Sequence, residues 1–292
     1  MLHPQLSRKI DYPVTLVPTD ARTLPDFTNP PVIEVALSAV FQPLQGYTSA
    51  HAGLFWTEVS KDFPRVEEQL PIAIPDEIES PQLVESGVRL QAMKDFPGPR
   101  LWLISEDGTE LIQLQNDTFS CNWRQEVPGA PYPRYGHVKS QFQNRFRSFI
   151  GFAERLGLGT VVPARCEVSY VNHIPAGQGW ERFGELHKIL SGYADKHTFL
   201  PEPEEVRYGA KFVMRDLTSG AFMGRLTVSA QPGVRRVDKK PLIALTLTSR
   251  GRPIGAGISG VLNFLDLGHE WIVQGFADLT TDEMHRIWGR NR

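Results

Sequence analysis

The sequence predicts an α+β protein made of two related units, in which antiparallel sheets are each covered by helices on one face. Segments in which apolar and polar residues alternate, as in half-buried strands, are interspersed with longer segments of helical periodicity. One alternating phrase also occurs twice. Residues 31–41 read PVIEVALSAVF and residues 164–174 read ARCEVSYVNHI, with Glu34 and Glu167 at the same place. The repeat indicates that each phrase is the first strand of its own unit.

The first unit, residues 31–160, begins with a strand that places Val35 and Leu37 on one face. A Thr-Ser pair can cap the helix that follows, and turn signals at 96–99 and 106–109 separate the later strands. In chain order, the expected elements are a strand at 31–41, a helix over 50–63, an irregular proline-rich segment at 64–81, strands at 87–95, 99–108 and 110–124, and a helix over 137–157.

The second unit, residues 161–292, repeats this order of elements. A duplicated unit of this kind most simply resembles the two-lobed architecture of the TATA-binding protein, although other helix-grip arrangements also fit the pattern. The expected elements are a strand at 166–174, a helix over 180–193, strands at 204–216, 220–231 and 240–249, a long helix over 259–279 and a short helical tail at 280–290 with a Thr/Asp cap.

Composition restricts the class of protein further. The net charge of −2 gives no general electrostatic reason to bind nucleic acid or an anionic membrane. No apolar segment has the length of a membrane span, and the N-terminus has no signal-like apolar region, so we expect a cytoplasmic protein. Residues 1–30 are rich in Pro, Thr and Asp and predict an extended arm lying on the domain, with disorder as the alternative. Cys121 and Cys166 predict buried free thiols, with a disulfide as the alternative.

Residues 255–260 read GAGISG, a G-x-G-x-x-G at the start of a predicted helix. In a dinucleotide-binding fold such glycines let a phosphate approach the helix N-terminus. That fold also needs a second parallel strand after the helix, whereas the remaining residues read as helix nearly to the end. We therefore predict a glycine-rich joint and no cofactor, and keep Arg250 and Arg252 beside it as a weak candidate anion site.

Glu34 and Glu167 are candidate binding residues, because carboxylates within apolar strands need partners. If a pseudo-twofold axis relates the units, both acids lie at equivalent places on the faces away from the helices. They would then form a paired acid-base or metal site, or each would meet an arginine such as Arg100, Arg207 or Arg225. A salt-bridged or surface role is the structural alternative and the more common one.

The segment around NDTFSCNWRQ supplies a third candidate. Asn122, Arg134 and Tyr135 would form a rim that recognises a ligand or a peptide, since Tyr and Arg are enriched at binding surfaces. The alternative is that the arginine braces the neighbouring loop. Asn172 and His269 fall on apolar stripes and predict structural hydrogen bonds. The sequence has no zincin, P-loop, serine-hydrolase or paired-cysteine motif, so we assign no catalytic residue and no metal site.

Several phrases along the chain carry a family resemblance. They are PPVIEVALSAVF near the start, FSCNWR and YPRYGHV in the middle, EVSYVNHI, and LNFLDLGHEWIVQGFADLTTDEMHRIWGR near the end, which together span about residues 30–290. In these phrases the chain resembles a family of uncharacterised, sporadically distributed bacterial proteins, and the last phrase is the most specific. The resemblance implies a soluble protein linked to mobile elements, and it supplies no activity and no catalytic residues.

These observations lead to three expected functions. The first is a non-enzymatic binding or protein-interaction module with an unidentified protein partner, from a defence or toxin–antitoxin-like system. The second is an enzyme or small-ligand sensor with a cleft between the two halves. The third is nucleic-acid binding on a saddle-like sheet, which rests on architectural analogy and which the near-neutral charge disfavours.

Overall fold

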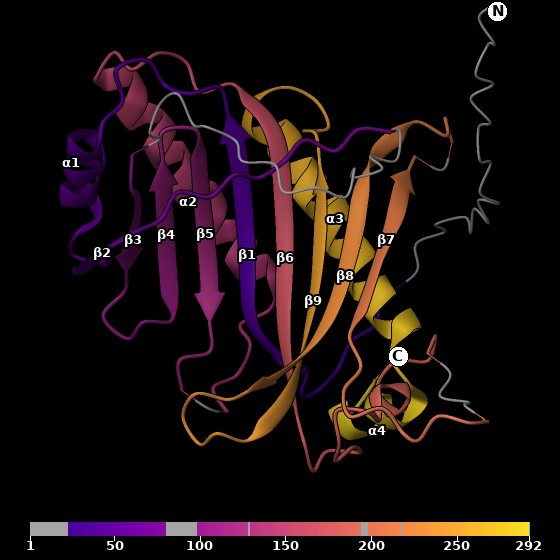
Figure 1. Cartoon of the computed structure of the whole chain (residues 1–292). Coiled ribbons are helices and arrows are strands. Elements are labelled where there is room, and N and C mark those ends of the chain that lie inside the picture. Colours follow the sequence, from indigo (N-terminus) through magenta and orange to yellow (C-terminus); the bar gives the residue numbers. More distant parts are fainter. Residues whose placement is uncertain (1–22, 80–97, 128, 194–197, 217, 292) are drawn as a thin grey trace, which may run out of the picture.

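In the described part of the chain, nine strands form one antiparallel sheet in the order β2-β3-β4-β5-β1-β6-β9-β8-β7, with the long helices on one of its faces (Figure 1). The predicted α+β class is thereby confirmed. The computed structural model describes residues 23–79, 98–127, 129–193, 198–216 and 218–291.

In each half, one strand comes first, a helix or a short helical turn follows, then a run of consecutive strands, and a long helix comes after them. The strands are β1 (Val32–Phe41), β2 (Arg65–Gln69), β3 (Arg100–Ile104), β4 (Glu110–Gln115), β5 (Thr118–Arg124), β6 (Pro163–Pro175), β7 (Tyr208–Arg215), β8 (Phe222–Val234) and β9 (Pro241–Gly251). The helices are α1 (Ser49–Val59), α2 (Tyr135–Arg155), α3 (Gly257–Leu279) and α4 (Asp282–Trp288), with a short 3-10 helix, η1, at Leu186–Lys188. None of the helices within the described ranges combines the length and the apolar character needed to cross a membrane.

The structure joins the sheets that the sequence predicts as separate. β1 and β6 lie antiparallel beside each other, with pairs such as Leu37–Val168 and Ser38–Glu167 along their length. An unpaired strand edge leaves backbone N–H and C=O groups without partners, and pairing the two edges satisfies both. The first strands of the two halves therefore form the centre of one continuous sheet.

Two segments of the first half differ from the expected elements. Residues 64–81, expected to be irregular, contain β2, which is an edge strand paired with β3. Residues 110–124 form two strands instead of one, because an Asn-Asp pair makes a two-residue turn between β4 and β5. The strand expected at 87–95 and the first part of the arm, residues 1–22, lie outside the described residues.

The prediction of a helix over residues 180–193 is wrong, since the chain forms only the short η1 there. Tertiary contacts determine the conformation of this segment. Gly184 lies so close to another part of the backbone that a Cβ would collide with the carbonyl oxygen of Pro203. Glu185 is turned back, and its carboxylate accepts a hydrogen bond from the backbone N–H of Glu181 at 2.8 Å. These contacts favour a compact irregular segment over a regular helix.

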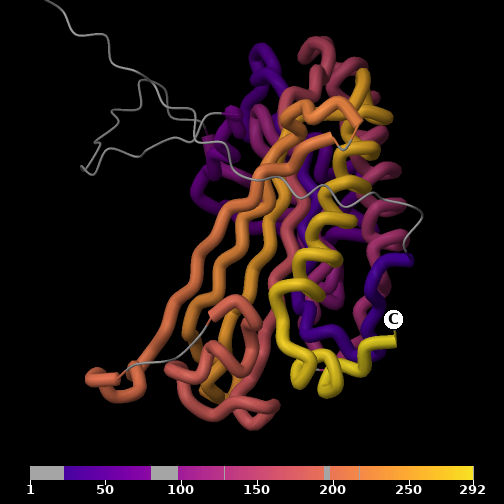
Figure 2. The backbone as a smooth tube through the Cα atoms, turned by 90° about the vertical axis from the view of Figure 1, so that its right-hand side faces the viewer, coloured from indigo at the N-terminus to yellow at the C-terminus, as the bar shows by residue number. Residues whose placement is uncertain are grey.

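The helices α2 and α3 lie side by side on one face of the sheet (Figure 2). Helical spacing directs Phe142, Phe146 and Phe149 of α2 at Phe119 on β5, with ring centroids 6.0, 5.3 and 5.3 Å away. All four rings are fully buried. Burial of a side chain of this size stabilises the fold by about 2–3 kcal/mol, so the cluster anchors α2 to the sheet.

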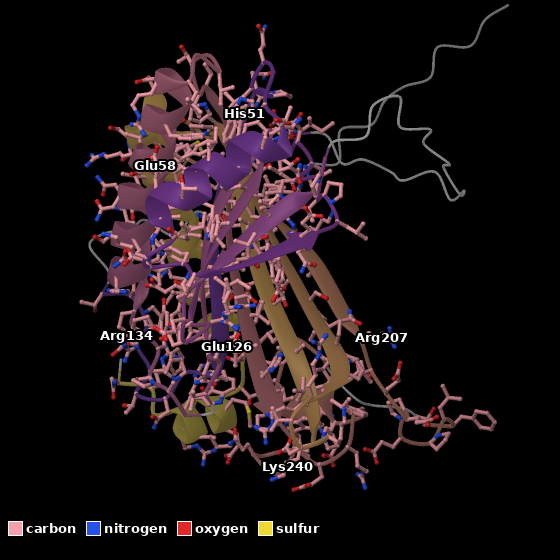
Figure 3. All side chains as sticks on the ribbon, turned by 90° about the vertical axis from the view of Figure 1, so that its left-hand side faces the viewer. His51, Glu58, Glu126, Arg134, Arg207 and Lys240 are labelled. Carbon is pink, nitrogen blue, oxygen red and sulfur yellow. The ribbon has the colours of Figure 1, made fainter. Side chains whose placement is uncertain are left out.

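Helix α1 packs beside α2 at the end of the sheet formed by β2 and β3. Its buried Phe55 meets Phe149 edge-on, with ring centroids 5.5 Å apart. At the surface, Arg155 of α2 donates two hydrogen bonds to the carboxylate of Glu58, at 2.7 and 2.8 Å. Figure 3 labels Glu58 on α1. The helical layer is therefore continuous from α1 through α2 to α3.

Within the described part of the chain, the other face of the sheet carries no helix (Figure 2). Residues 70–79, which we call the crossing segment, run over one end of this open face from β2 toward β7 and β8 (Figure 1). Acidic residues of the crossing segment meet arginines of the sheet, Asp76 with Arg165 at 3.3 Å and Glu79 with Arg215 at 2.9 Å. These ion pairs fasten the crossing segment across the strands.

Candidate functional site

Glu34 and Asn122, two of the predicted site residues, bind each other on the open face of the sheet. They lie on the paired strands β1 and β5, and Nδ2 of Asn122 donates to Oε1 of Glu34 at 2.5 Å. The side-chain oxygen of Asn122 in turn accepts a hydrogen bond from Gln113 at 2.8 Å. Burial raises the pKa of Glu34, although Asn122 and Arg124 oppose the shift. Glu34 therefore has an amide as its closest partner, in place of the expected arginine.

Glu167 lies on the same open face and meets a different partner. Its carboxylate accepts hydrogen bonds from Nε and Nη2 of Arg250 at 2.8 and 2.5 Å. The register of β1 and β6 places Val171 opposite Glu34, which separates the two acids by about 13 Å along the strand. The acids therefore do not share one site. Among the described residues, no group of three or more His, Cys, Asp or Glu side chains is arranged to hold a metal ion.

Arg250 and Arg252, the candidate anion site, are engaged differently. Arg250 is bound to the carboxylate of Glu167 on the open face, whereas the side chain of Arg252 is exposed beyond the end of β9. The adjoining glycine motif forms a tight turn into α3, in which the backbone N–H of Ile254 donates to the carbonyl oxygen of Gly260 at 2.8 Å. The motif is a structural joint between β9 and α3.

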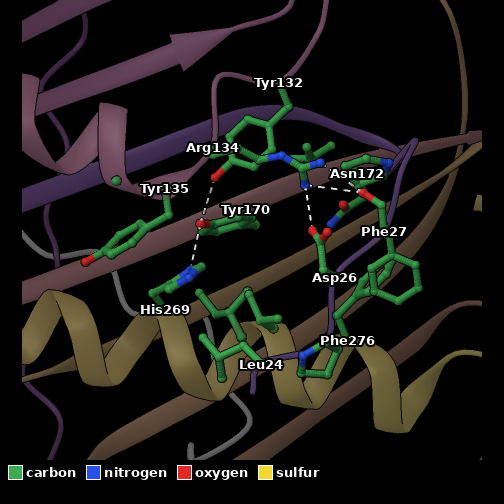
Figure 4. Close-up of a pocket in the computed structure, with 16 residues that line it drawn as sticks. Leu24, Asp26, Phe27, Tyr132, Arg134, Tyr135, Tyr170, Asn172, His269 and Phe276 are labelled. Carbon is green, nitrogen blue, oxygen red and sulfur yellow. Dashed lines mark hydrogen bonds and ion pairs between the residues drawn. The ribbon is translucent and has the colours of Figure 1, made fainter. Parts of the chain in front are cut away.

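A cavity of about 350 Å³ lies on the opposite, helical face of the sheet (Figure 4). Four distant parts of the chain enclose this pocket: the arm, the start of α2, the middle of β6 and the middle of α3. Its apolar wall consists of Leu24, Pro25, Phe27, Pro30, Val32, Ile272, Val273 and Phe276. Its polar wall consists of Asp26, Tyr132, Arg134, Tyr135, Tyr170, Asn172 and His269. A mostly apolar cavity with a few convergent polar groups is typical of a small-molecule site.

Three polar side chains form a continuous hydrogen-bonded chain in the wall of the pocket (Figure 4). Oη of Tyr132 lies 3.1 Å from Oη of Tyr170, which lies 2.8 Å from Nδ1 of His269. The imidazole of His269 is stacked on the ring of Tyr135, with centroids 3.8 Å apart. The hydroxyl of Tyr135 donates to Asp266 at 3.0 Å. Each ring is thus held in place by its neighbours.

The three side chains joined by these hydrogen bonds, Tyr132, Tyr170 and His269, are neutral near pH 7. Burial lowers the pKa of His269 to about 4, although Asp266 opposes the shift. Burial raises the pKa of Tyr132 to about 12 and raises that of Tyr170 well above its usual value. The three side chains can donate and accept hydrogen bonds, but none is poised to exchange a proton near neutral pH.

Arg134 closes the pocket on the side of the arm. It is the N-cap of α2, and its φ of 74° lies in the left-handed region, which costs a non-glycine residue about 1–2 kcal/mol. Its guanidinium donates to Oδ1 of Asp26 at 2.9 Å and twice to the carbonyl oxygen of Phe27 at 3.2 Å (Figure 4). Figure 3 shows Arg134 on the side of the sheet that carries α2. The contacts with the arm hold this unusual backbone conformation.

The described part of the arm, residues 23–30, is fixed against the C-terminal helices. The ring of Phe27 packs edge-on against Phe276 and Trp288, with centroids 5.5 and 6.2 Å away. The backbone N–H of Asn29 donates to the carbonyl oxygen of Trp288 at 3.0 Å. The arm therefore forms one wall of the pocket and is anchored on both sides of the cavity.

Two of the three residues of the predicted rim lie at this pocket. Arg134 and Tyr135 line it, whereas Asn122 lies on the opposite face of the sheet. Asn172 and His269, to which the sequence assigned structural hydrogen bonds, make such bonds and also line the cavity.

Sequence reasoning missed Asp26 and Tyr170. A signal for Tyr170 was present, since it alternates with Asn172 on the buried face of β6, and two polar side chains on an otherwise apolar face indicate a polar environment. Asp26 carries no comparable signal, because an acidic residue in a proline-rich arm is ordinary.

Comparisons of the chain with protein-family models, with curated proteins and with solved structures find no match. The resemblance to a bacterial family stays a prediction.

Proposed function

We propose that the protein is a non-enzymatic binding module that holds a small molecule in the pocket beneath the arm. The observation that carries this proposal is a cavity of about 350 Å³ whose surface is mostly apolar and whose tyrosine and histidine groups are held by hydrogen bonds. In such sites the apolar wall supplies most of the affinity and the polar groups set the orientation of the ligand. Tyr132, Tyr170 and His269 provide hydrogen-bonding groups in one wall, and Arg134 provides a cation at the arm.

The ionisation states in the pocket favour binding over catalysis. An acid-base catalyst works best with a pKa near the operating pH, whereas burial moves the pKa of His269 to about 4 and that of Tyr132 to about 12. The two cysteines, Cys121 and Cys166, are free and buried outside the pocket, and burial raises the pKa of both thiols. A neutral hydrogen-bonding wall suits a ligand that is held and released unchanged.

We also propose that the scaffold arose by duplication of one unit and has a TATA-binding-protein-like layout. Each half contributes neighbouring strands in corresponding order, β1-β5-β4-β3 and β6-β9-β8-β7, and ends in a long helix. In the repeated phrase, Glu34 corresponds to Glu167 and Ser38 to Val171. The observed pairs Ser38–Glu167 and Glu34–Val171 are therefore the pairs that a twofold axis between β1 and β6 requires. Superposition of the two halves tests this proposal.

A second candidate function is the docking of a protein partner. The exposed apolar side chains of the edge strand β7 support this candidate. Phe212 and Val213 lie on this strand, and each is 38% exposed. An edge strand with exposed apolar side chains can pair with a strand of another chain. A partner from the mobile-element system that the family resemblance implies should then co-purify from the native host. Repeated recovery of the protein alone under several growth conditions would argue against this candidate.

Titration with small neutral aromatic compounds tests the pocket directly. Benzamide, phenol and indole are added to the purified protein, and binding is followed by ligand-observed NMR and calorimetry. Val273→Trp fills the cavity from α3 and should abolish binding, whereas Asp278→Trp adds the same ring at an exposed position of the same helix and should leave binding unchanged. Equal binding by both variants, or failure of the wild type to bind both this panel and the anionic probe benzoate, would overturn the proposal.

A further inference from the structure

We infer that the pocket takes a small monocarboxylate with an apolar body, and that Arg134 receives the ligand carboxylate in the place that Asp26 occupies. The inference rests on the proposed function, because it names the ligand class of the same pocket. Three features carry it: the backbone conformation and position of Arg134, the exposure of its ion pair with Asp26, and the uncharged character of the remaining wall.

Arg134 is directed at the pocket by an unfavourable backbone conformation. Its φ of 74° is unusual for a residue with a side chain, and strain of this kind is concentrated at functional sites. Arg134 stands at the start of α2, where the helix dipole also favours an anion. The first turn of α2 contains no acidic residue, and the side chain of the N-cap residue, Arg134, makes no capping hydrogen bond. The positive charge at this point is therefore balanced from the arm and not from the helix.

Asp26 supplies that balancing charge in an exchangeable way. Its Oδ1 lies 2.9 Å from Nη1 of Arg134, and both side chains are 51% exposed. The second oxygen of Asp26 accepts a longer hydrogen bond of 3.3 Å from Asn291. An ion pair this exposed contributes little to stability, so a ligand carboxylate can replace Asp26 while Asp26 turns to solvent. Figure 4 shows the two side chains meeting at the edge of the pocket. A cationic ligand would be repelled by the guanidinium.

The rest of the wall fits an uncharged body. Phe27, Ile272 and Phe276 present apolar surface to the cavity. Tyr170 and His269 are joined by a 2.8 Å hydrogen bond and are both neutral near pH 7, because burial disfavours their charged forms. A second charge on the ligand would find no counter-ion there. The ligand class that fits every wall of the pocket is a monocarboxylate with an aryl or branched alkyl body.

Benzoate and benzamide are matched chemical probes, because they share a shape and differ in charge. Calorimetric titration at pH 7 should show that benzoate binds at least about tenfold more tightly, as expected for charge-assisted hydrogen bonds. Arg134→Gln should remove this preference and leave benzamide binding unchanged. Asp26→Asn should tighten benzoate binding, because the competing carboxylate is gone. Arg147→Gln, at an exposed position of the same helix, is the charge-matched control and should behave as the wild type.

Opposite effects of the two substitutions on benzoate binding separate ligand recognition from a structural ion pair. If the pair only fastened the arm, both variants would weaken both probes to the same degree, and the inference would be overturned. Asp26→Asn keeps the inference testable even if Arg134→Gln does not fold, since Asp26 is an exposed side chain.

The result also distinguishes the inference from the proposed function. Equal affinity of the wild type for the two probes, abolished for both by Val273→Trp, would overturn the carboxylate class and support the pocket. Failure of the wild type to bind either probe, together with failure of phenol and indole to bind, would overturn both.

Discussion

Glu167 and Arg250 face each other on the paired strands β6 and β9, and two hydrogen bonds of 2.8 and 2.5 Å join their side chains. Water reaches little of either group, since 16% and 21% of their side-chain surfaces are exposed. Removing one partner of such a pair leaves a shielded charge without compensation. The pair therefore contributes to the stability of the sheet next to its centre.

Neutralising the acid of this pair should destabilise the protein. We expect Glu167→Gln to lower the free energy of unfolding by about 1–3 kcal/mol, because Arg250 then keeps only the longer contact of 3.3 Å to Glu77. The double variant Glu167→Gln/Arg250→Gln should recover part of this loss, since no charge is left unpaired. Urea denaturation at pH 7 measures each variant. If the loss of stability in the double variant equals the sum of the losses in the two single variants, this account is contradicted.

The crossing segment should open locally when Glu77 loses its charge. Glu77 is 10% exposed and binds Arg225 at 2.8 Å and Arg250 at 3.3 Å, so it fastens residues 70–79 to two strands. We expect Glu77→Gln to accelerate hydrogen exchange across residues 70–79 by at least about tenfold, because its ion pairs with both arginines lose their charge. Glu68→Gln, at an exposed position on β2, is the control and should leave exchange unchanged. Identical protection in both variants would show that Glu77 does not hold the segment.

His269 should make the protein less stable in acid. Burial lowers its pKa to about 4 in the folded protein, against about 6.5 for an exposed histidine. The unfolded state therefore binds the proton more readily, and the stability contributed by neutral His269 is complete above about pH 6.5 and is lost as the pH falls toward 4.

We expect this loss to be roughly 1–3 kcal/mol across the interval. Urea denaturation at pH 7 and at pH 4.5 measures it, and His269→Gln serves as the comparison because glutamine keeps a hydrogen-bonding group and does not titrate. The difference in stability between the two pH values should be smaller in the variant. The same pH dependence in both proteins would rule out His269 as its source.

The turn before α3 should depend on the last glycine of the GAGISG motif. A Cβ at Gly260 would collide with the backbone oxygen of Gly255, whereas Gly257, with a φ of 57°, has open space around it. We expect Gly260→Ala to cost more than about 2 kcal/mol through overpacking, and Gly257→Ala to cost about 1 kcal/mol through its backbone conformation. Chemical denaturation compares the two, and equal costs would mean that the turn adjusts to a Cβ.

The sequence predicted those elements whose cause lies within a short segment. Alternation identified the strand that contains Val35 and Leu37, and helical spacing identified the helix that contains Phe142 and Phe146. The pairing of β1 with β6 has no local signal, because it joins segments from opposite halves of the chain. The helix prediction over residues 180–193 is wrong for the same reason, since contacts with distant segments override the local helical pattern there.

The pocket was predictable only through the types of its residues. Arg134 and Tyr135 were identified because such residues favour binding surfaces, and the structure places both at the cavity. The cavity itself arises where the arm passes between α2 and the C-terminal helices, and no spacing in the sequence encodes that passage. Asp26 acquires its significance from this arrangement alone, through its contact with Arg134.

The central ladder between β1 and β6 also limits how a ligand would enter the proposed pocket. Two-lobed binding proteins commonly admit ligands by a hinge motion that swings their lobes apart. Here the same motion would break a row of backbone hydrogen bonds in the middle of the sheet. A ligand of the proposed pocket would instead enter and leave through a small displacement of residues 24–30, so the overall dimensions of the molecule should be the same with the pocket filled or empty.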